Sequence, residues 1–272
     1  METLSIKAGP NEKIIVSPLI DSHAHLDFQE FDHDRAELFQ KMREQGITQV
    51  VIPGVSEQKW SNQLRIAKAY NCPFALGVHP WFCHSMTEQT LPNLRQLLLS
   101  VRQPQKLVAI GECGLDKLHK SNFTTQLAVF KAQITLAEEF DLPLIIHCVK
   151  SHEEMLCLLK NAQNAKKGVI HGFYGGPELA LRYVNLGYKL GIGGLLLNDG
   201  AKKLQQTVAQ LPVSAFVLET DSPAMSPRSS GNVRNSPLIL PLLLRKVASL
   251  QKKTNVLISE QLYLNVTQLF DL

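Results

Sequence analysis

The sequence predicts an α/β fold, a (β/α)8 barrel of the TIM type, and three observations support this prediction. Eight short apolar runs alternate with segments of helical pattern, as in βαβ units built around a parallel sheet. Most of the runs are continuously apolar, which is typical of parallel strands covered on both faces. The chain has 272 residues, near the ~250 of a single barrel. No run is followed by the GxGxxG pattern that would favour an open Rossmann-type sheet.

The predicted strands are short runs rich in Val, Ile and Leu. They cover residues 18–21, 49–53, 74–79, 107–112, 144–147, 169–171, 188–192 and 215–219. The intervening segments are predicted to be helices.

The clearest helix is expected at 34–45, where Asp34 is placed to cap the N-terminus and Gly46 to end the helix. Leu38, Phe39 and Met42 lie on one face of it. Further helices are expected at 125–140, 177–187, 237–252 and 259–269.

Domain organisation follows from the absence of a linker or repeat. We expect one catalytic domain at 18–272 and a short N-terminal extension at 1–17. No window reaches the roughly 18 apolar residues of a membrane span, and residues 1–13 lack the apolar core of a signal peptide. Five cysteines, an odd number without CxxC, argue against a disulfide framework and fit a reducing compartment. A cytoplasmic protein is therefore expected, with neither a membrane nor an obligate protein partner.

The charge balance is mildly basic, with a formal net charge of +4 and a pI of about 8.7. It permits a phosphate-bearing substrate but does not identify one, because dedicated nucleic-acid binders usually carry clustered basic stripes.

Polar side chains that can bind metal stand at the ends of six predicted strands. Burying such groups without partners costs several kcal/mol, so their repeated placement is not expected by chance. In a barrel the carboxyl ends of the strands meet at one mouth, where active sites lie. These residues are His23, His25, His79, Glu112, His147, His171 and Asp221. His23 and His25 are two residues apart, so they share one strand face and can approach one metal ion.

Motifs around these residues resemble an ordered family signature. They read DSHAHLD at 21–27, GVHP at 77–80, AIGECGLD at 109–116, HGFYG at 171–175 and LETDSP at 218–223, with GYKLGIGG at 187–194 and RNSP at 234–237. Together with His147, this pattern is similar to the TatD-type metal-dependent deoxyribonucleases, and within them to the YjjV-like branch. The resemblance runs from about residue 18 to the C-terminus.

The resemblance implies a two-metal centre in a TIM barrel. It implies that His23, His25 and Asp221 bind one divalent ion, that His147 and His171 bind the second, and that Glu112 bridges them. Imidazole and carboxylate ligands suit Zn²⁺, Mn²⁺, Fe²⁺ or Ni²⁺, while Mg²⁺ prefers oxygen-rich sites. Glu112 and Asp221 are the expected catalytic residues, with Asp221 also able to orient an attacking water as general base. The alternative for Asp221 is that its side chain only caps the following helix. For Asp21, direct binding of metal and support of a neighbouring ligand are equally well founded.

The expected partner is DNA or a small phosphodiester. His79 is similar to the family's phosphate-contacting histidine, although a buried hydrogen-bonded histidine is the alternative. The family commonly has His-x-Arg at the fifth strand end, and here Val149 stands in the arginine position. Lys150, Arg228 and Arg234 are the remaining candidate phosphate contacts, and solvated side chains are the equal alternative for both arginines.

Four other histidines, His33, His84, His119 and His152, are expected at the surface. His119, with Lys117, could still reach a substrate.

Two other functions stay open on the sequence. An amidohydrolase-type enzyme acting on a C–N or C–O bond would share the barrel and the His-x-His opening. Many amidohydrolases have a carbamylated lysine at strand four, whereas this chain has Glu112, which favours phosphodiester hydrolysis. A non-catalytic binding protein is disfavoured, because clustered carboxylates and histidines without metal would stay unsatisfied.

Overall fold

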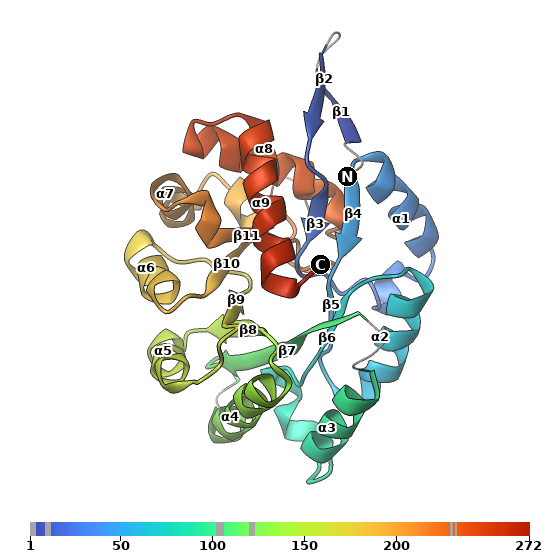
Figure 1. Cartoon of the computed structure of the whole chain (residues 1–272), viewed down its shortest axis with the longest axis vertical. Coiled ribbons are helices and arrows are strands. Elements are labelled where there is room, and N and C mark those ends of the chain that lie inside the picture. Colours follow the sequence, from blue (N-terminus) through green and yellow to red (C-terminus); the bar gives the residue numbers. More distant parts are fainter. Residues whose placement is uncertain (1–3, 9–11, 102–105, 120–122, 229–230, 232) are drawn as a thin grey trace. The chain divides into compact units, whose positions relative to one another are not determined.

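The computed structural model describes residues 4–8, 12–101, 106–119, 123–228, 231 and 233–272 (Figure 1). The chain forms two compact units. Unit 1 comprises Met1–Val51, Gly172–Leu181 and Leu190–Leu272, and unit 2 comprises Ile52–His171 and Arg182–Lys189.

Unit 2 is built on five parallel strands that pair in chain order (Figure 1). They are β5 (Ile52–Pro53), β6 (Phe74–Leu76), β7 (Leu107–Asp116), β8 (Leu144–Val149) and β9 (Gly168–Ile170). The helices between them are α2 (Glu57–Ala69), α3 (Thr90–Val101), α4 (Phe123–Phe140) and α5 (His152–Asn161). Helix α4 packs on β7, with Phe130 and Ala137 completely buried. The strands therefore have covered faces, which explains their continuous apolar runs.

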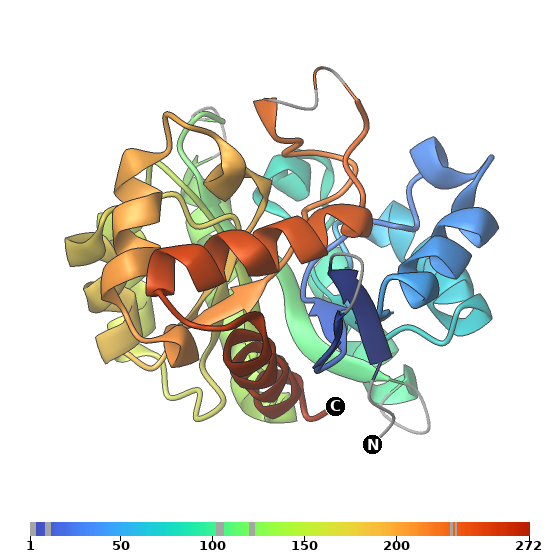
Figure 2. The same cartoon turned by 90° about the horizontal axis from the view of Figure 1, so that it is seen from above.

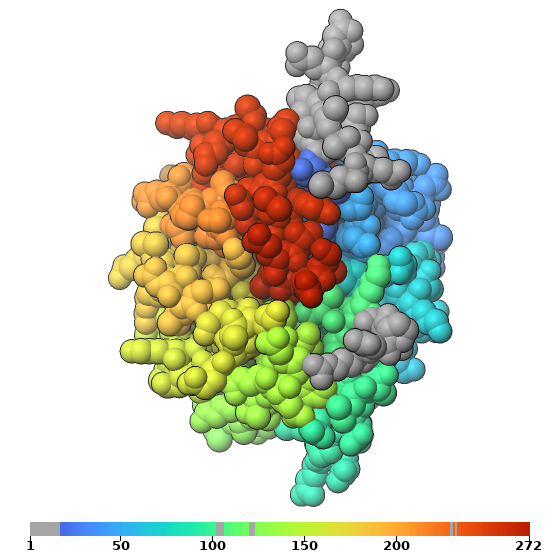
Figure 3. All heavy atoms as spheres, viewed as in Figure 1, coloured from blue at the N-terminus to red at the C-terminus, as the bar shows by residue number. Residues whose placement is uncertain are grey.

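Unit 1 contains two parallel strand pairs and the C-terminal helices. The strands are β3 (Leu19–Asp21) with β4 (Ile47–Val50), and β10 (Lys189–Ile192) with β11 (Phe216–Leu218). The helices are α1 (Arg35–Glu44), α7 (Lys202–Gln210), α8 (Leu240–Gln251) and α9 (Asn255–Phe270), and α6 (Pro177–Asn185) begins in this unit. Helices α8 and α9 contact each other and strands β3 and β11, and they form the continuous red surface in Figure 3.

The ends of β3 and β11 are joined through the backbone. The Ser22 amide donates to the Leu218 carbonyl at 2.9 Å, and the Asp221 amide donates to the His23 carbonyl at 2.9 Å. Helix α8 follows β11 after a long loop, which is seen from above in Figure 2. Residues far apart in the sequence thus meet at one edge of unit 1.

The parallel strands and intervening helices confirm the predicted α/β class. Each of the eight predicted runs contains a strand, but several boundaries were wrong. Residues 49–53 are divided between β4 and β5, while β7 continues to Asp116 and β8 to Val149. The strands β1 (Leu4–Ala8) and β2 (Glu12–Val16), an antiparallel pair, were not predicted.

Helix α1 begins where it was predicted, but its cap differs. The starts of α4, α8 and α9 differ from the prediction by two, three and four residues. Asp34 does not cap α1 through its side chain, because its carboxylate binds the Arg234 guanidinium instead. Helix α9 begins at Asn255 rather than at residue 259, since the Thr254 hydroxyl accepts the Leu257 amide as an N-cap.

All five cysteines are free thiols. Among the described residues, no helix is both long and apolar enough to cross a membrane.

Candidate metal centre

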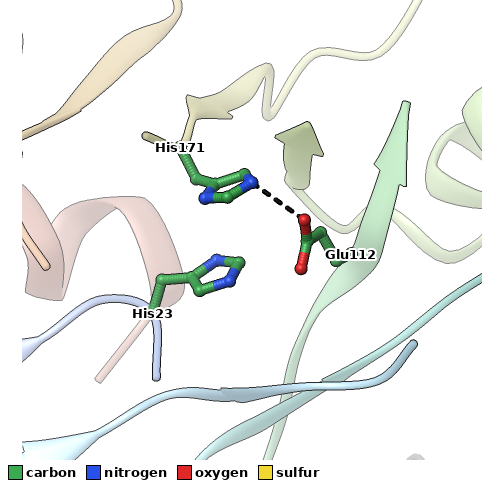
Figure 4. Close-up of side chains that lie close together, drawn as sticks. All are labelled: His23, Glu112 and His171. Carbon is green, nitrogen blue, oxygen red and sulfur yellow. Dashed lines mark ion pairs between the residues drawn. The ribbon is translucent and has the colours of Figure 1, made fainter. Parts of the chain in front are cut away.

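In unit 2, Glu112 lies among three histidines. Its Oε1 is 2.8 Å from His171 Nε2 and 3.1 Å from His147 Nδ1, and the pair with His171 is drawn in Figure 4. The two imidazoles are 3.0 Å apart, from His147 Nδ1 to His171 Nε2. Glu112 is 2% exposed, so polar neighbours such as these histidines must take the place of bulk water around its carboxylate.

The local backbone explains how Glu112 reaches this position. Strand β7 has an irregular register against β8 between Ile110 and Cys113. Gly111 has φ +153°, and an added Cβ would lie 2.7 Å from the Ile145 carbonyl oxygen. A side chain at Gly114 would collide with the His147 carbonyl. The two glycines therefore permit the close approach of β7 to β8 that brings Glu112 and His147 together.

His79 is the third histidine at Glu112, with Nε2 3.1 Å from Glu112 Oε1. Its Nδ1 accepts the Trp81 amide at 3.1 Å, so the neutral ring carries its proton on Nε2, facing the carboxylate. Burial lowers the pKa of His79 to about 4. His79 is thus a buried neutral N–H donor at the edge of the cluster.

Asp116, at the end of β7, completes this side of the site. Its Oδ2 accepts the Trp81 indole N–H at 2.6 Å and lies 3.4 Å from His147 Nε2. Burial opposes its ionisation, but hydrogen bonds from His147 and Trp81 lower the pKa of Asp116 to about 2. Burial likewise opposes charge on His147, yet hydrogen bonds to Asp116 and Glu112 raise its pKa to about 9. With Nε2 directed at Asp116, His147 keeps Nδ1 for the cluster, the arrangement by which an outer carboxylate orients a metal-binding imidazole.

In unit 1, His23, His25 and Asp221 form a second cluster. The Nε2 atoms of the two histidines are 3.3 Å apart, and Asp221 Oδ1 is 3.3 Å from that of His23 and 3.5 Å from that of His25. The backbone bonds between the ends of β3 and β11 hold these residues together. His23 and His25 are buried, while the Asp221 side chain is 16% exposed.

Asp21 supports this cluster rather than facing it. Its Oδ1 accepts the amides of His23 and Thr220, each at 3.1 Å, and its Oδ2 accepts the Thr220 hydroxyl at 2.6 Å. Burial raises the pKa of Asp21 to about 7, although these hydrogen bonds favour its charged form. Asp21 therefore fixes the turn after β3 that presents His23.

Glu219 also lies below this cluster, completely buried. Its Oε1 accepts the Gly172 amide, and its carboxylate fills the space where a side chain at Gly191 would stand. Burial raises the pKa of Glu219 to about 8, with the His23 charge acting in the opposite direction. Glu219 thus anchors the backbone at Gly172.

The predicted phosphate contacts have different surroundings. Lys150 follows β8 as an exposed residue with φ +54°, and Val149 is the last residue of that strand. Arg228 is exposed and lines a hollow of about 510 Å³ with Met225 and Val233.

The Arg234 guanidinium makes a bidentate pair with Asp34, at 2.9 and 2.5 Å. It also lies 4.3 Å from the Phe31 ring. Neither alternative for Arg234, a phosphate contact or a solvated side chain, anticipated this pair, which ties the loop after β11 to the start of α1.

The surface histidines were predicted correctly except for one. His33, His84 and His119 are exposed. His152 is half-buried, with Nδ1 2.9 Å from the Tyr183 hydroxyl. This contact could not be predicted from the sequence around His152, because Tyr183 lies 31 residues away.

Both clusters have the donor chemistry of a transition-metal site. The candidate groups within single units are His23, His25 and Asp221, and His79, Glu112 and His147, each with ligand atoms within 4.8 Å of one another. Mixed imidazole and carboxylate donors fit Zn²⁺, Mn²⁺, Fe²⁺ or Ni²⁺ better than Mg²⁺. In unit 2, His171 Nε2 stands as close to Glu112 as His147 does.

Comparison with known proteins places this chain in a family. The family model described as "TatD related DNase" matches residues 20–271. The chain is 34% identical over 213 residues to YjjV of Escherichia coli K12, described as an uncharacterized metal-dependent hydrolase, covering 78% of this chain and 82% of that protein. It is 31% identical over 265 residues to the 3'-5' ssDNA/RNA exonuclease TatD of Erwinia amylovora, covering 93% of this chain and 100% of that protein.

The crystal structure of E. coli YjjV has the same fold. It superposes with a TM-score of 0.89 at 32% identity, covering 93% of this chain and 98% of that one. This similarity confirms the predicted TIM-barrel class.

Proposed function

Because this chain belongs to the TatD-related DNase family of metal-dependent hydrolases, we propose that it is a deoxyribonuclease that cleaves phosphodiester bonds. The single observation that favours this chemistry is Glu112 among the histidines His79, His147 and His171. A carboxylate in this position, in place of a carbamylated lysine, favours phosphodiesters over the C–N bonds of amidohydrolases. The relative named as a 3'-5' ssDNA/RNA exonuclease supports single-stranded nucleic acid as the substrate.

The proposed cofactors are two divalent ions per chain. His23, His25 and Asp221 would hold one, and Glu112, His147 and His171 the other, with Glu112 as the bridge that the family resemblance implies. When bound, such ions neutralise the charge that develops at phosphorus and make water a stronger nucleophile. The candidate ions are Zn, Mn, Mg, Fe and Ni.

Asp221 is the proposed general base. It is the more exposed carboxylate of the two clusters, and a general base must lie within hydrogen-bond reach of the water whose proton it accepts. His79 is the proposed phosphate contact. Its Nε2–H faces Glu112 in this structure, and we propose that it would donate to a phosphate oxygen instead when Glu112 holds metal.

The other candidate phosphate contacts are proposed to have weaker or more indirect roles than that of His79. Arg228 and Lys150 are exposed cations and are proposed to attract the nucleic-acid backbone. Arg234 is proposed to position the loop after β11, because its guanidinium is already paired with Asp34.

The test uses metal-stripped protein with Mn²⁺, Zn²⁺ or Mg²⁺ added back singly. Single-stranded DNA, small phosphodiesters and amides are assayed side by side. We expect DNA hydrolysis that disappears on chelation and returns with metal. Hydrolysis of amides alone would establish the amidohydrolase alternative instead, and activity that resists chelation would refute the metal-dependent mechanism.

A further inference from the structure

Trp81 is an exposed aromatic residue beside the Glu112 cluster. It lies in the short 3-10 helix Pro80–Ser85, directly after His79, and is 47% exposed. Its ring centroid is 5.0 Å from that of His79 and 6.2 Å from that of His147. Burying a large aromatic side chain is energetically favourable. A half-exposed tryptophan this close to two site histidines is therefore a candidate for contact with a ligand.

A second exposed ring lies next to it. The His119 centroid is 5.2 Å from that of Trp81, with 36° between the planes. His119 stands in the turn after β7, where the preceding residue, Leu118, is 71% exposed. Unit 2 therefore presents neighbouring aromatic and apolar surface to solvent beside the cluster.

The Trp81 ring and the backbone that carries His119 are anchored by buried polar groups. The Asp116 carboxylate accepts the Trp81 indole N–H on Oδ2 and the Leu118 amide on Oδ1, at 2.6 and 2.8 Å. Gln126, which is completely buried, accepts the Asp116 amide at 2.7 Å and donates to the His119 carbonyl at 3.2 Å. The exposed rings thus sit on a fixed support, so little conformational entropy is lost when a flat ligand binds them.

We propose that Trp81, together with His119, forms a stacking site for a nucleobase of the single-stranded substrate. This inference rests on the proposed function, and it assigns a substrate-binding role to a residue outside the predicted metal ligands. Aromatic side chains bind bases by stacking without regard to sequence, because every base has a π-face. Val149 stands where relatives commonly have an arginine that can bind phosphate. Stacking on the base would compensate for the loss of that phosphate contact.

Substitutions at Trp81 can separate stacking from the hydrogen bond to Asp116. Trp81→Phe removes the N–H but keeps an aromatic ring, whereas Trp81→Ala removes both. We expect Trp81→Ala to raise KM for single-stranded DNA roughly tenfold to a hundredfold, and Trp81→Phe to raise it by much less. Metal content is measured in both variants, since both lose the hydrogen bond to Asp116, and equal metal content would show that the difference in KM between them comes from the aromatic ring. Equal KM values in the two variants would mean that Trp81 acts only through its hydrogen bond to Asp116, and this would overturn the stacking role.

Fluorescence gives a readout that does not depend on turnover. The chain has two tryptophans, and Trp60 is 4% exposed with its indole N–H donated to the Gly77 carbonyl. In Trp60→Phe, indole emission comes from Trp81 only, and Trp81→Phe is the matched control that leaves Trp60. The probe is a short deoxyadenosine oligomer with phosphorothioate linkages, compared with an abasic oligomer of the same length and charge.

We expect the base-bearing oligomer to quench Trp81 emission and the abasic oligomer to do so much less, with no quenching in Trp81→Phe. Equal quenching by both oligomers, or none from either, would overturn the stacking site. The two proposals fail separately. Quenching without DNA hydrolysis would refute the proposed function alone, and hydrolysis without base-dependent quenching would refute the stacking site alone.

Discussion

The two clusters use the same residue types but differ in their surroundings. In unit 2 the Glu112 side chain is 3% exposed and lies within 3.1 Å of three histidines, and Asp116 supports one of them from behind. In unit 1 the Asp221 side chain is 16% exposed and faces two histidines. The carboxyls that support this second cluster, Asp21 and Glu219, have pKa values raised by burial to about 7 and about 8.

This difference suggests that the two clusters have different roles, one in holding metal and the other in proton transfer. The unit 2 cluster surrounds one buried carboxylate with three closely placed histidines, which suits a scaffold that fixes metal ligands. The unit 1 cluster leaves its carboxylate open to water, which suits proton transfer. The following variants test whether the two clusters differ in this way.

Glu112→Gln should have the largest effect. The substitution removes the negative charge that faces His79, His147 and His171, so we expect loss of metal from unit 2 and activity at background level. Inductively coupled plasma mass spectrometry and a DNA hydrolysis assay measure the two effects. Glu88→Gln is the matched control at an exposed position of the same unit. Retention of all bound metal in Glu112→Gln would contradict the bridging role.

Asp221→Asn should lower kcat by about 10²–10⁴-fold, the usual contribution of a general base. The fold should persist, since Asp221 is a partly exposed residue after the end of β11, and circular dichroism checks this. The exposed Asp199→Asn in the same unit is the control. Near-normal turnover in Asp221→Asn would exclude this residue both as base and as essential ligand.

Asp116→Asn should have an intermediate effect. An amide in place of this carboxylate weakens the hold on His147 Nε2, and loss of an outer partner typically costs about 10–100-fold in metal affinity. Titration of stripped protein with Zn²⁺ and a chelating competitor measures the change. Unchanged affinity would mean that His147 is oriented without Asp116.

Arg234→Lys should have the smallest effect. Lysine cannot make the bidentate pair with Asp34, and pairs at this degree of exposure contribute about 0.2–1 kcal/mol to stability. We expect a small decrease in Tm with KM for DNA unchanged. A severalfold rise in KM at unchanged Tm would instead make Arg234 a phosphate contact.

Much of the fold was predictable because its signals are local. Apolar runs ended by polar residues identified the strands that present His23, Glu112, His147 and Asp221, and the parallel α/β class followed from their alternation with helices. Strand ends were less predictable. Gly114, with Glu112 and Asp116 on either side of it, resembles a loop, yet β8 pairs with this stretch and extends the strand.

The side-chain partnerships were not predictable, because they join residues far apart in the sequence. Asp is a residue type that commonly caps helices, so the sequence predicted Asp34 as an N-cap. Its actual partner, Arg234, lies 200 residues away. The indole N–H of Trp81 reaches Asp116 across 35 residues. A tryptophan after His-Pro and an acid ending the AIGECGLD motif were the available signals, and neither identifies the other as its partner.

The most direct test of the central claim is the metal stoichiometry of the wild-type protein after stripping and reconstitution with Mn²⁺ or Zn²⁺, measured together with hydrolysis of single-stranded DNA. The account predicts about two ions per chain and activity that rises as they bind. A protein that binds no divalent ion, or that hydrolyses DNA equally well without one, would contradict it.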